Sequence, residues 1–319
     1  MHKIEWTDKT WNVITGCTQI SPECDNCYAK AMTKHLQGMA RKELEKKTNL
    51  KCQVCGFDFV EHSVVEEYTE IAHSYNDDYQ VICAGDCGGL EPHKAFDLPK
   101  YYLGWDKVVF HKEALDDILD KKKYPSGSKI FVNSMSDTFH EDISEDDLVE
   151  LFNIMSKRQD LIFQILTKRA NRMFHFLSWV LPRTGCLTDE YLDKKMKSHI
   201  WFGVTAENQE YVDKRIPKLL KLKDVVNEDI KCFVSIEPML SEIDLTPYLD
   251  KLDWVIIGGE NIPNNPNKAR LMRWEWVESI YRQCQSKDVP FFFKRWSGIN
   301  ANRKDLRWYI ERCKEFPRD

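Results

Sequence analysis

The sequence has no apolar run close to the roughly 20 residues that a membrane-spanning helix needs. Its first residues, Met1 to Trp6, lack the apolar core of a signal peptide. Internal repeats and low-complexity tracts are absent as well, and the formal charge of -5 over 319 residues is modest. We therefore expect a cytoplasmic protein with no membrane partner, and its bulk charge does not indicate a nucleic-acid partner.

Cysteine, in contrast, is plentiful, with eleven residues in the chain. In a reducing compartment so many thiols are unlikely to form a disulfide framework. Seven of them occur in two clusters with the spacing of metal ligands, namely Cys17, Cys24 and Cys27, and Cys52, Cys55, Cys83 and Cys87. The sequence therefore predicts two metal sites.

The first cluster has the pattern Cys17-x6-Cys24-x2-Cys27, directly after a strand-like segment. A structural zinc site takes four ligands, whereas three thiolates on one loop can hold three irons of a 4Fe-4S cluster and leave the fourth iron open. The alternative is a closed site with a distant fourth thiolate, for which the candidates are Cys186, Cys232, Cys284 and Cys313.

The second cluster consists of two knuckle-like pairs, Cys52-x2-Cys55 and Cys83-x3-Cys87. Glycine follows both pairs, and the pattern is typical of a zinc ribbon with four cysteine ligands for Zn2+. A histidine could replace one ligand, with His62, His73 and His93 as candidates. The surrounding stretch is acidic, so contact with a protein partner suits the module better than binding of phosphates.

From about residue 105 onward, short β-branched or aromatic runs alternate with helical patterns. We predict strands at Trp11–Thr15, Lys107–His111, Lys129–Asn133, Leu161–Leu166, His199–Val204, Lys231–Ile236, Trp254–Ile257 and Pro290–Lys294. The predicted helices are Glu113–Lys121, Glu145–Lys157, Arg169–Trp179, Glu210–Lys221 and Trp274–Cys284.

Eight such units predict an α/β fold, a (β/α)8 TIM-type barrel with parallel strands buried on both faces. The barrel would comprise residues 1–44 and 99–319, with 45–98 inserted as the zinc-ribbon-like module. A doubly wound open sheet is the alternative, because one sequence does not reveal strand order.

Polar residues gather where each predicted strand ends. The segments are 134–137, 167–169, 205–207, 237–238, 258–260 and 294–296. In a barrel these positions share the rim on which active sites are assembled. Any single segment is explained by the polarity of loops, but six in succession favour a shared site.

Several motifs together resemble the phage-associated radical-SAM-like protein family of unknown function. The motifs are Trp-Asn-x-x-Thr-Gly-Cys-Thr, Cys-Asp-Asn-Cys-Tyr-Ala, Ser-Met-Ser-Asp, Leu-Thr-Lys-Arg, Gly-Val-Thr-x-Glu-Asn, Ser-Ile-Glu-Pro-Met-Leu, Gly-Gly-Glu and Phe-Phe-Phe-Lys-x-Trp. The resemblance covers nearly the whole chain apart from the predicted zinc module.

This resemblance implies radical S-adenosylmethionine chemistry, in which a 4Fe-4S cluster binds S-adenosylmethionine at its open iron and generates a 5'-deoxyadenosyl radical for hydrogen abstraction. It implies an electron donor such as a flavodoxin or ferredoxin, and phage association would suit a nucleobase or nucleotide as substrate. The first gap of six residues is longer than the three that are commonest in the superfamily.

The resemblance also implies roles for individual residues. The cluster ligands would be Cys17, Cys24 and Cys27. Glu207 would accept the ribose hydroxyls of S-adenosylmethionine, and Lys168 would pair with its methionine carboxylate. The full set implied for this cofactor is Ser134, Ser136, Asp137, Thr167, Lys168, Thr205 and Glu207.

Three further charged residues, Glu237, Glu260 and Lys294, would face the substrate as catalytic residues. The superfamily's Gly-Gly-Glu usually follows the second strand and binds the cofactor, whereas Gly258-Gly259-Glu260 follows the seventh predicted strand. We therefore expect it to contact substrate, and contact with the cofactor stays the alternative. For the three charged residues together, the other interpretation is a ring of ion pairs that closes the barrel mouth.

A second interpretation of the whole chain belongs to another functional class. In it the protein is a non-enzymatic iron-sulfur and zinc protein that binds nucleic acid or acts as a scaffold. A cluster closed by four protein ligands would favour this interpretation, because it leaves no iron open to S-adenosylmethionine.

Overall fold

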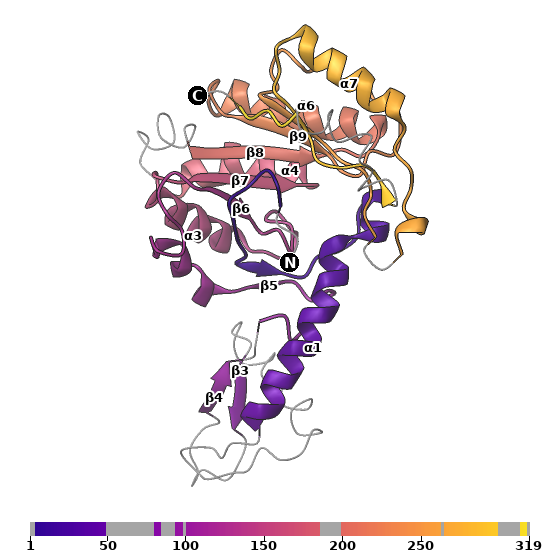
Figure 1. Cartoon of the computed structure of the whole chain (residues 1–319). Helices are drawn as coiled ribbons and strands as arrows, with labels where there is room; N and C mark the ends of the chain where they lie inside the picture. The colour runs from indigo at the N-terminus through magenta and orange to yellow at the C-terminus, as the bar shows by residue number, and fades with distance from the viewer. Residues whose placement is uncertain are drawn as a thin grey trace. The chain divides into compact units, whose positions relative to one another are not determined.

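The computed structural model describes residues 4–48, 80–83, 93–97, 100–185, 199–262, 265–298 and 313–317. The chain divides into two compact units, one formed by Met1–Ala29 with Val108–Asp319 and the other by Lys30–Lys107 (Figure 1). The predicted module, 45–98, falls within the second unit, and its boundaries stay a prediction. None of the described helices is long and apolar enough to cross a membrane.

The first unit is built on a sheet of seven parallel strands (Figure 1). The strands are β1 (Lys9–Trp11), β6 (Lys129–Val132), β7 (Ile162–Thr167), β8 (Ile200–Thr205), β9 (Cys232–Ile236), β10 (Trp254–Ile257) and β11 (Phe291–Phe293). Their order across the sheet is their order along the chain. Right-handed crossovers between such neighbours place the connecting helices on one face of the sheet.

This strand order confirms the α/β class and the parallel sheet. A doubly wound sheet reverses its order at a switch point, and the described sheet has no reversal, so that alternative is wrong. A closed barrel of eight strands is not formed by the described residues either. Their sheet has seven strands, and β1 and β11 lie at its two edges.

One of the eight predicted strands, Lys107–His111, lies outside the main sheet. Only Val109–Phe110 is extended, as β5, and it pairs antiparallel with β2 (Ile14–Thr15). The predicted first strand, Trp11–Thr15, is likewise divided between β1 and β2. The antiparallel pair of β2 with β5 therefore stands where the predicted barrel has one more parallel strand.

The side chain of Asn133 explains where the first strand divides. Its backbone N–H donates to the carbonyl of Trp11 and continues the ladder of β1 with β6. Its Oδ1 then accepts hydrogen bonds from the backbone N–H groups of Val13 (2.9 Å) and Ile14 (3.0 Å). These two donors are satisfied by a side chain instead of by a neighbouring strand, so the chain is free to turn toward β5.

Four of the five predicted helices are confirmed. They are α3 (Glu145–Ser156), α4 (Ala170–His175, continued by a π-helical turn, Phe176–Val180), α6 (Gln209–Val225) and α7 (Trp274–Ser286). The predicted helix Glu113–Lys121 instead forms two 3-10 turns, Lys112–Ala114 and Asp116–Leu119.

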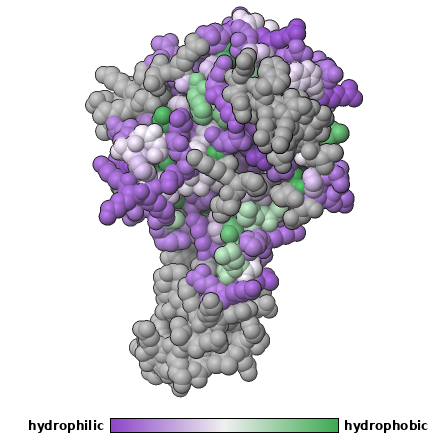
Figure 2. Space-filling model, in the orientation of Figure 1, coloured by the Kyte–Doolittle hydropathy of each residue, from purple (hydrophilic) through white to green (hydrophobic). Residues whose placement is uncertain are grey.

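Helix α3 illustrates how the sequence specifies these elements. Ser144 precedes it, and the Ser144 hydroxyl accepts a hydrogen bond from the backbone N–H of Asp147, as an N-cap does. Leu148, Leu151 and Met155 recur at helical spacing and are buried in the main hydrophobic core, which also contains one face of every sheet strand. Among the residues coloured in Figure 2, hydrophilic ones, in purple, make up most of the visible surface.

The second unit contains α1 (Tyr28–Thr48) from residue 30 onward and a two-stranded hairpin. The hairpin strands are β3 (Gln80–Cys83) and β4 (His93–Asp97), which run antiparallel. Cys83 ends β3 and lies opposite His93 in the register. The predicted zinc ligands Cys52, Cys55 and Cys87 lie outside the described residues, as do His62 and His73.

The sheet face that points away from the helices carries a second, mainly aromatic core. Its buried members include Trp201 of β8, Phe233 of β9, Trp254 of β10 and Phe292 of β11. Trp6 from the start of the chain packs against Phe233 and Trp254, with ring centroids 6.3 and 6.2 Å apart. Large rings therefore fill the interior of the curled sheet on this side.

Gly203 of β8 makes room for one of these rings. A Cβ atom at this position would lie 2.4 Å from ring atoms of Phe233, far inside contact distance. The ring cannot move away easily, because Trp6 and Trp254 surround it. Gly203 is therefore required by packing rather than by backbone conformation.

We predict that Gly203→Ala lowers the free energy of unfolding by about 1–3 kcal/mol, because the Phe233 ring must leave its rotamer. Urea unfolding followed by tryptophan fluorescence would measure the loss. Gly38→Ala in α1 is the control, since no atom lies within 4 Å of its added Cβ, and it should leave the transition of the first unit unchanged. An unaltered midpoint for Gly203→Ala would contradict this packing.

Candidate functional site

The predicted polar segments lie at one edge of the sheet, as expected. All seven strands are parallel, so their carboxyl ends are on the same side. Each of the last six strands is followed there by a charged residue, in chain order Asp137, Lys168, Glu207, Glu237, Glu260 and Lys294. This edge is where a parallel sheet assembles a site.

The three early cysteines lie on the segment from Gly16 to Cys27, here called the cysteine loop, between β2 and α1. Gly16 has a positive φ of 79° and forms a parallel bridge with Ser136. Cys24 lies in a short 3-10 helix, Pro22–Asn26, and Cys27 follows it. None of these three cysteines forms a disulfide, and all three are partly exposed, so they remain accessible to a ligand.

The start of the cysteine loop is held by the segment after β6. The Ser136 hydroxyl donates a hydrogen bond to the carbonyl of Gly16. The Ser134 hydroxyl donates to Asn12 Oδ1 at 3.1 Å. Both serines, predicted as contacts of S-adenosylmethionine, thus contact the chain that leads into the cysteines.

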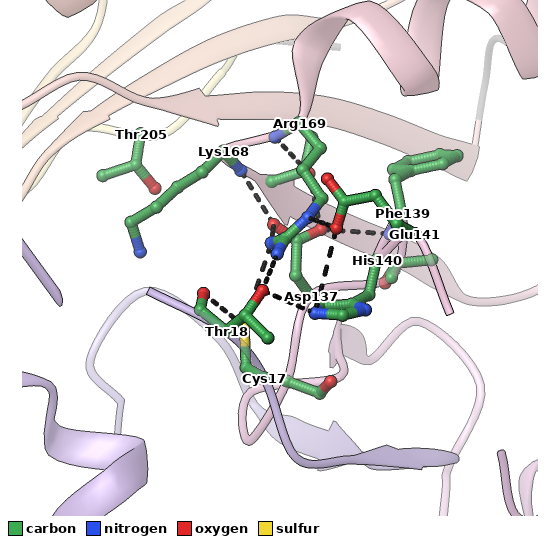
Figure 3. Close-up of polar contacts among 12 residues, drawn as sticks. Cys17, Thr18, Asp137, Phe139, His140, Glu141, Lys168, Arg169 and Thr205 are labelled. Atoms are coloured by element: carbon green, nitrogen blue, oxygen red, sulfur yellow. Dashed lines mark hydrogen bonds and ion pairs between the residues drawn. The ribbon is translucent and has the colours of Figure 1, made fainter. Parts of the chain in front are cut away.

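Arg169 holds the next part of the loop (Figure 3). Its Nε donates to Glu141 (2.7 Å), its Nη1 to Asp137 (3.0 Å) and its Nη2 to the hydroxyl of Thr18 (2.8 Å). Nη1 also donates to the sulfur of Cys17 at 3.8 Å. The guanidinium is buried, and its planar set of donors fixes the first cysteine relative to the sheet.

Asp137 orients this guanidinium. One carboxylate oxygen accepts from the Thr167 hydroxyl (2.6 Å) and the backbone N–H of Phe139 (3.0 Å). The other accepts from the backbone N–H of Lys168 (3.0 Å) and from Arg169. A buried carboxylate with four donors is fully satisfied, so Asp137 joins the ends of β6 and β7.

His140 contacts the same loop at Thr18 (Figure 3). Its Nδ1 accepts from the backbone N–H of Asp142 (3.2 Å), so Nε2 carries the ring proton and donates to the Thr18 hydroxyl at 2.8 Å. Burial and the nearby Arg169 lower the pKa of His140. The imidazole is therefore neutral at physiological pH and acts as a hydrogen-bond donor.

The Cys17 thiol is protonated when no metal is bound. Burial and the charge of Asp137 raise its pKa to about 11, although Arg169 and Lys168 act in the opposite direction. A bound metal ion reverses this balance, because a coordinating thiol is deprotonated outright. Proton release on metal loading follows from this site.

The middle of the cysteine loop is held by Lys168. Its ammonium pairs with Glu23 at 3.0 Å, and Glu23 directly precedes Cys24. The backbone N–H of Glu23 faces Glu207 at 3.4 Å, and Glu207 in turn accepts from Arg215 at 3.1 Å. Glu207 is completely buried, so a connected chain of polar contacts, with a cation at each end and two carboxylates between them, supports the middle of the loop.

Lys168 also lies within electrostatic reach of all three thiols. Burial alone would lower its pKa, but Glu23 and the thiols of Cys24 and Cys27 outweigh burial and raise the pKa above its ordinary value. The same ammonium lowers the pKa of Cys17. Burial raises the pKa of Glu23 to about 7, against the influence of Lys168.

Glu260 and Arg270 hold the far end of the loop. The Glu260 carboxylate accepts from the side chain of Arg270, from its backbone N–H (2.7 Å) and from Asn26 (3.1 Å). Arg270 also donates to the carbonyl of Pro22 (2.9 Å) and pairs with Asp25 at 3.4 Å. Glu260 is therefore occupied by contacts to the loop, and its predicted contact with substrate stays a prediction.

Glu237 and Lys294 meet above Gly258. Their charged groups are 2.8 Å apart, and β10, which lies between β9 and β11, ends at Ile257, directly before Gly258. A Cβ on Gly258 would lie 2.5 Å from a Glu237 oxygen, which explains the glycine between two charged strand ends. The pair is half-buried, as an ion pair at the mouth of the sheet would be.

The remaining predicted cofactor residue is Thr205, the last residue of β8. It is buried, and its backbone carbonyl accepts from Arg215 at 2.7 Å. Thr205 pairs in register with Ser235 of β9, and both lie on the aromatic side of the sheet, toward the carboxyl edge. Small hydroxyl side chains thus border the aromatic core next to the charged residues.

Sequence reasoning missed the partners of the predicted residues. Arg169 directly follows Lys168 and could have been included for its position at a strand end. Glu23 and His140 lie close to recognised motifs but have no signal of their own. Arg270 gives no sequence signal at all, because its pairing with Glu260 depends on the fold.

The described residues contain no three His, Cys, Asp or Glu side chains close enough to share one metal ion. A cubane spaces its thiolates more widely than a single ion does, so the donor set is the relevant test. Three candidates for a fourth thiolate, Cys232, Cys284 and Cys313, are buried in the main hydrophobic core. Cys186 lies outside the described residues. Three partly exposed thiols with cations beside them fit a cluster that has one open iron.

We predict that Asp137→Asn lowers the free energy of unfolding by about 2–4 kcal/mol, because the buried Arg169 loses its counter-charge and an amide NH2 would face donors. Chemical denaturation would measure this. Asp142→Asn in the same segment is the control, since that carboxylate is 65% exposed and should matter little. Equal stability of the two variants would contradict the role given to Asp137.

Comparison with known proteins yields one match. Neither the curated proteins nor the solved structures show significant similarity to the chain. A family model described as "Protein of unknown function (DUF5131)" matches residues 1–312, which is nearly the whole chain and includes every candidate site residue. The chain therefore belongs to the DUF5131 family.

Proposed function

We propose that the protein is a radical S-adenosylmethionine enzyme that holds a 4Fe-4S cluster on Cys17, Cys24 and Cys27. The observation that supports this proposal is the placement of three partly exposed cysteines, none of them in a disulfide, at the carboxyl edge of a parallel sheet. Contacts from the ends of β6, β7, β8 and β10 hold the loop that carries them.

Such a cluster would supply an open iron to chelate S-adenosylmethionine and the electron that cleaves it, giving the enzyme a means of abstracting hydrogen. The chain's own contribution is to position the ligands and to exclude water. Arg169 and Arg270 fix the two ends of the cysteine loop. The aromatic core around Trp254 fills the interior of the sheet beneath the carboxyl edge. It would exclude water from one side of the reactants.

The proposal extends to the fold, as a barrel-like arrangement of the radical SAM kind. Strands in chain order with helices on one face are what a (β/α) barrel has, and its active site lies at the carboxyl edge. The cysteine loop contacts the ends of strands well inside the sheet. The contacts that hold the cysteine loop therefore do not depend on whether β1 and β11 pair to close the sheet into a barrel.

Within this proposal we reassign several residues implied for S-adenosylmethionine. Ser134, Ser136 and Asp137 would position the cysteine loop instead of contacting the cofactor, since their polar groups already bind that loop or its anchors. Glu237 and Lys294 stay our candidates for contact with substrate. A carboxylate and an ammonium held 2.8 Å apart could exchange their mutual contact for a polar substrate.

We predict that anaerobic reconstitution yields about four irons per chain on the cluster. Reduction with dithionite in the presence of S-adenosylmethionine should then release 5'-deoxyadenosine. Cys24→Ala should lose both the cluster and this product, because a ligand is missing. Cys284→Ala is the control, because this thiol is buried in α7 and should not affect iron content.

Two outcomes would overturn the proposal. Iron content that is unchanged in Cys17→Ala, Cys24→Ala and Cys27→Ala would place the cluster elsewhere. A reduced wild-type cluster that yields no 5'-deoxyadenosine would favour the non-enzymatic iron-sulfur alternative. Mass spectrometry of the products and iron analysis of each variant provide these readouts.

For the second unit we propose a zinc site with Cys52, Cys55, Cys83 and Cys87 as ligands. The module that carries it would bind a protein partner. The supporting observation is that β3 ends at Cys83, as a ribbon strand ends at a zinc knuckle. We predict about one zinc per chain beside the irons. The double variant Cys52→Ser, Cys55→Ser should lose zinc and keep iron, as elemental analysis would measure; retained zinc would exclude the site.

A further inference from the structure

Two consecutive cations reach the cysteine loop from the end of β7. The ammonium of Lys168 is 3.0 Å from Glu23, the residue before Cys24. The guanidinium of Arg169 donates to Cys17 at 3.8 Å. Both residues therefore face the loop, one at its middle and the other at its start.

Their approach is fixed by Asp137. One of its carboxylate oxygens accepts both the backbone N–H of Lys168 and the side chain of Arg169, each at 3.0 Å. The side chain of Lys168 is 20% exposed, so water screens its charge only partly. A positive charge is thus held in a low-dielectric position beside the thiols.

The positive charge of Arg169 is largely neutralised by two carboxylates. Asp137 and Glu141 both accept from it, at 3.0 and 2.7 Å. Lys168, in contrast, forms an ion pair with Glu23 alone among the residues that the structure describes. Lys168 is therefore the cation whose charge acts most directly on the middle of the cysteine loop.

A cluster on three thiolates adds negative charge to this position, and its reduction adds one unit more. Net charge and surroundings of this kind tune the potential of an iron-sulfur cluster. A nearby cation favours the reduced state, whereas a nearby carboxylate disfavours it. Because water screens a buried pair only weakly, each member of the Lys168–Glu23 pair should act in its own direction.

We propose that Lys168 sets the reduction potential of the cluster held by the cysteine loop, and that it does not bind the carboxylate of S-adenosylmethionine. Lys168 is a positioning and charge-compensating residue, because it acts through the cysteine loop instead of touching substrate. The inference rests on the proposed function, since it requires a cluster on Cys17, Cys24 and Cys27.

The test is a double-mutant cycle on the ion pair, with the reduction potential as readout. The reconstituted full-length protein, without S-adenosylmethionine, is titrated anaerobically at pH 8.5 and followed by electron paramagnetic resonance. Lys168→Met should shift the midpoint to more negative values, and Glu23→Gln should shift it to more positive values. The double variant should return close to wild type, because the net charge is restored.

The exposed pair of Lys214 with Glu210 on α6 provides the matched control. Both side chains are more than half exposed, so Lys214→Met should leave the midpoint unchanged. Opposite shifts from the two members of the buried pair are the critical result. A merely structural disturbance would move both variants in the same direction or broaden both signals.

The outcomes separate this inference from the proposed function. If wild-type protein binds no cluster, the proposed function fails. If the cluster forms but Lys168→Met and Glu23→Gln leave its potential unchanged, or shift it in the same direction, only the inference on Lys168 is overturned. If Lys168→Met does not load iron, Glu23→Gln alone still tests the inference. A shift of its reduction potential to more positive values supports the inference, and no shift or a negative one overturns it.

Affinity for S-adenosylmethionine gives the second arm of the test. Equilibrium dialysis with the loaded protein should give similar dissociation constants for wild type and Lys168→Met. A tenfold or greater loss of affinity with an unchanged potential would assign Lys168 to the cofactor carboxylate and overturn the inference. Lys168→Arg, which keeps the charge, should preserve the potential.

Discussion

The buried carboxylate of Asp137 is the contact on which the candidate site depends. It binds the end of β7 to the segment after β6 and directs Lys168 and Arg169 toward the cysteine loop. Removing a counter-charge from a buried guanidinium is costly, since the charge would then be desolvated without compensation. The position of Cys17 therefore depends on a residue 120 positions away as much as on its own loop.

The cysteine loop has little regular structure of its own, apart from one short 3-10 helix. Its geometry comes from the sheet, through serines after β6, cations after β7 and the carboxylate after β10. Sites built on rigid elements hold ligands more accurately than isolated loops do. The arrangement thus combines accessible thiols with a backbone that is anchored along its whole length.

Much of the fold could be predicted, because buried parallel strands appear as short apolar runs and helices as amphipathic periods. β8 and β10 are buried at every position, and α3 has a capping serine with a regular apolar stripe. The departure of β2 from the sheet was missed, since it depends on the side chain of Asn133, a residue with positive φ.

At the site, the sequence located the edge but not the pairings across it. Parallel strands bring their polar ends together whatever the register, so the shared edge was predictable. Which cation meets which carboxylate depends on register and twist, and a shift of one residue would redirect every side chain. Glu260 illustrates this, because its motif suggested substrate whereas the fold pairs it with Arg270.

The small ladder of β2 with β5 has a further consequence for chain connectivity. The backbone N–H of His111 donates to the carbonyl of Val13, so the ladder joins the chain before the cysteine loop to the chain that follows Lys107. The segment between β2 and β5, which includes the cysteine loop and Lys30–Lys107, is closed by this ladder like a long loop. Loop entropy rises only slowly with length, so excursions of very different size could be accommodated here without altering the register of the main sheet.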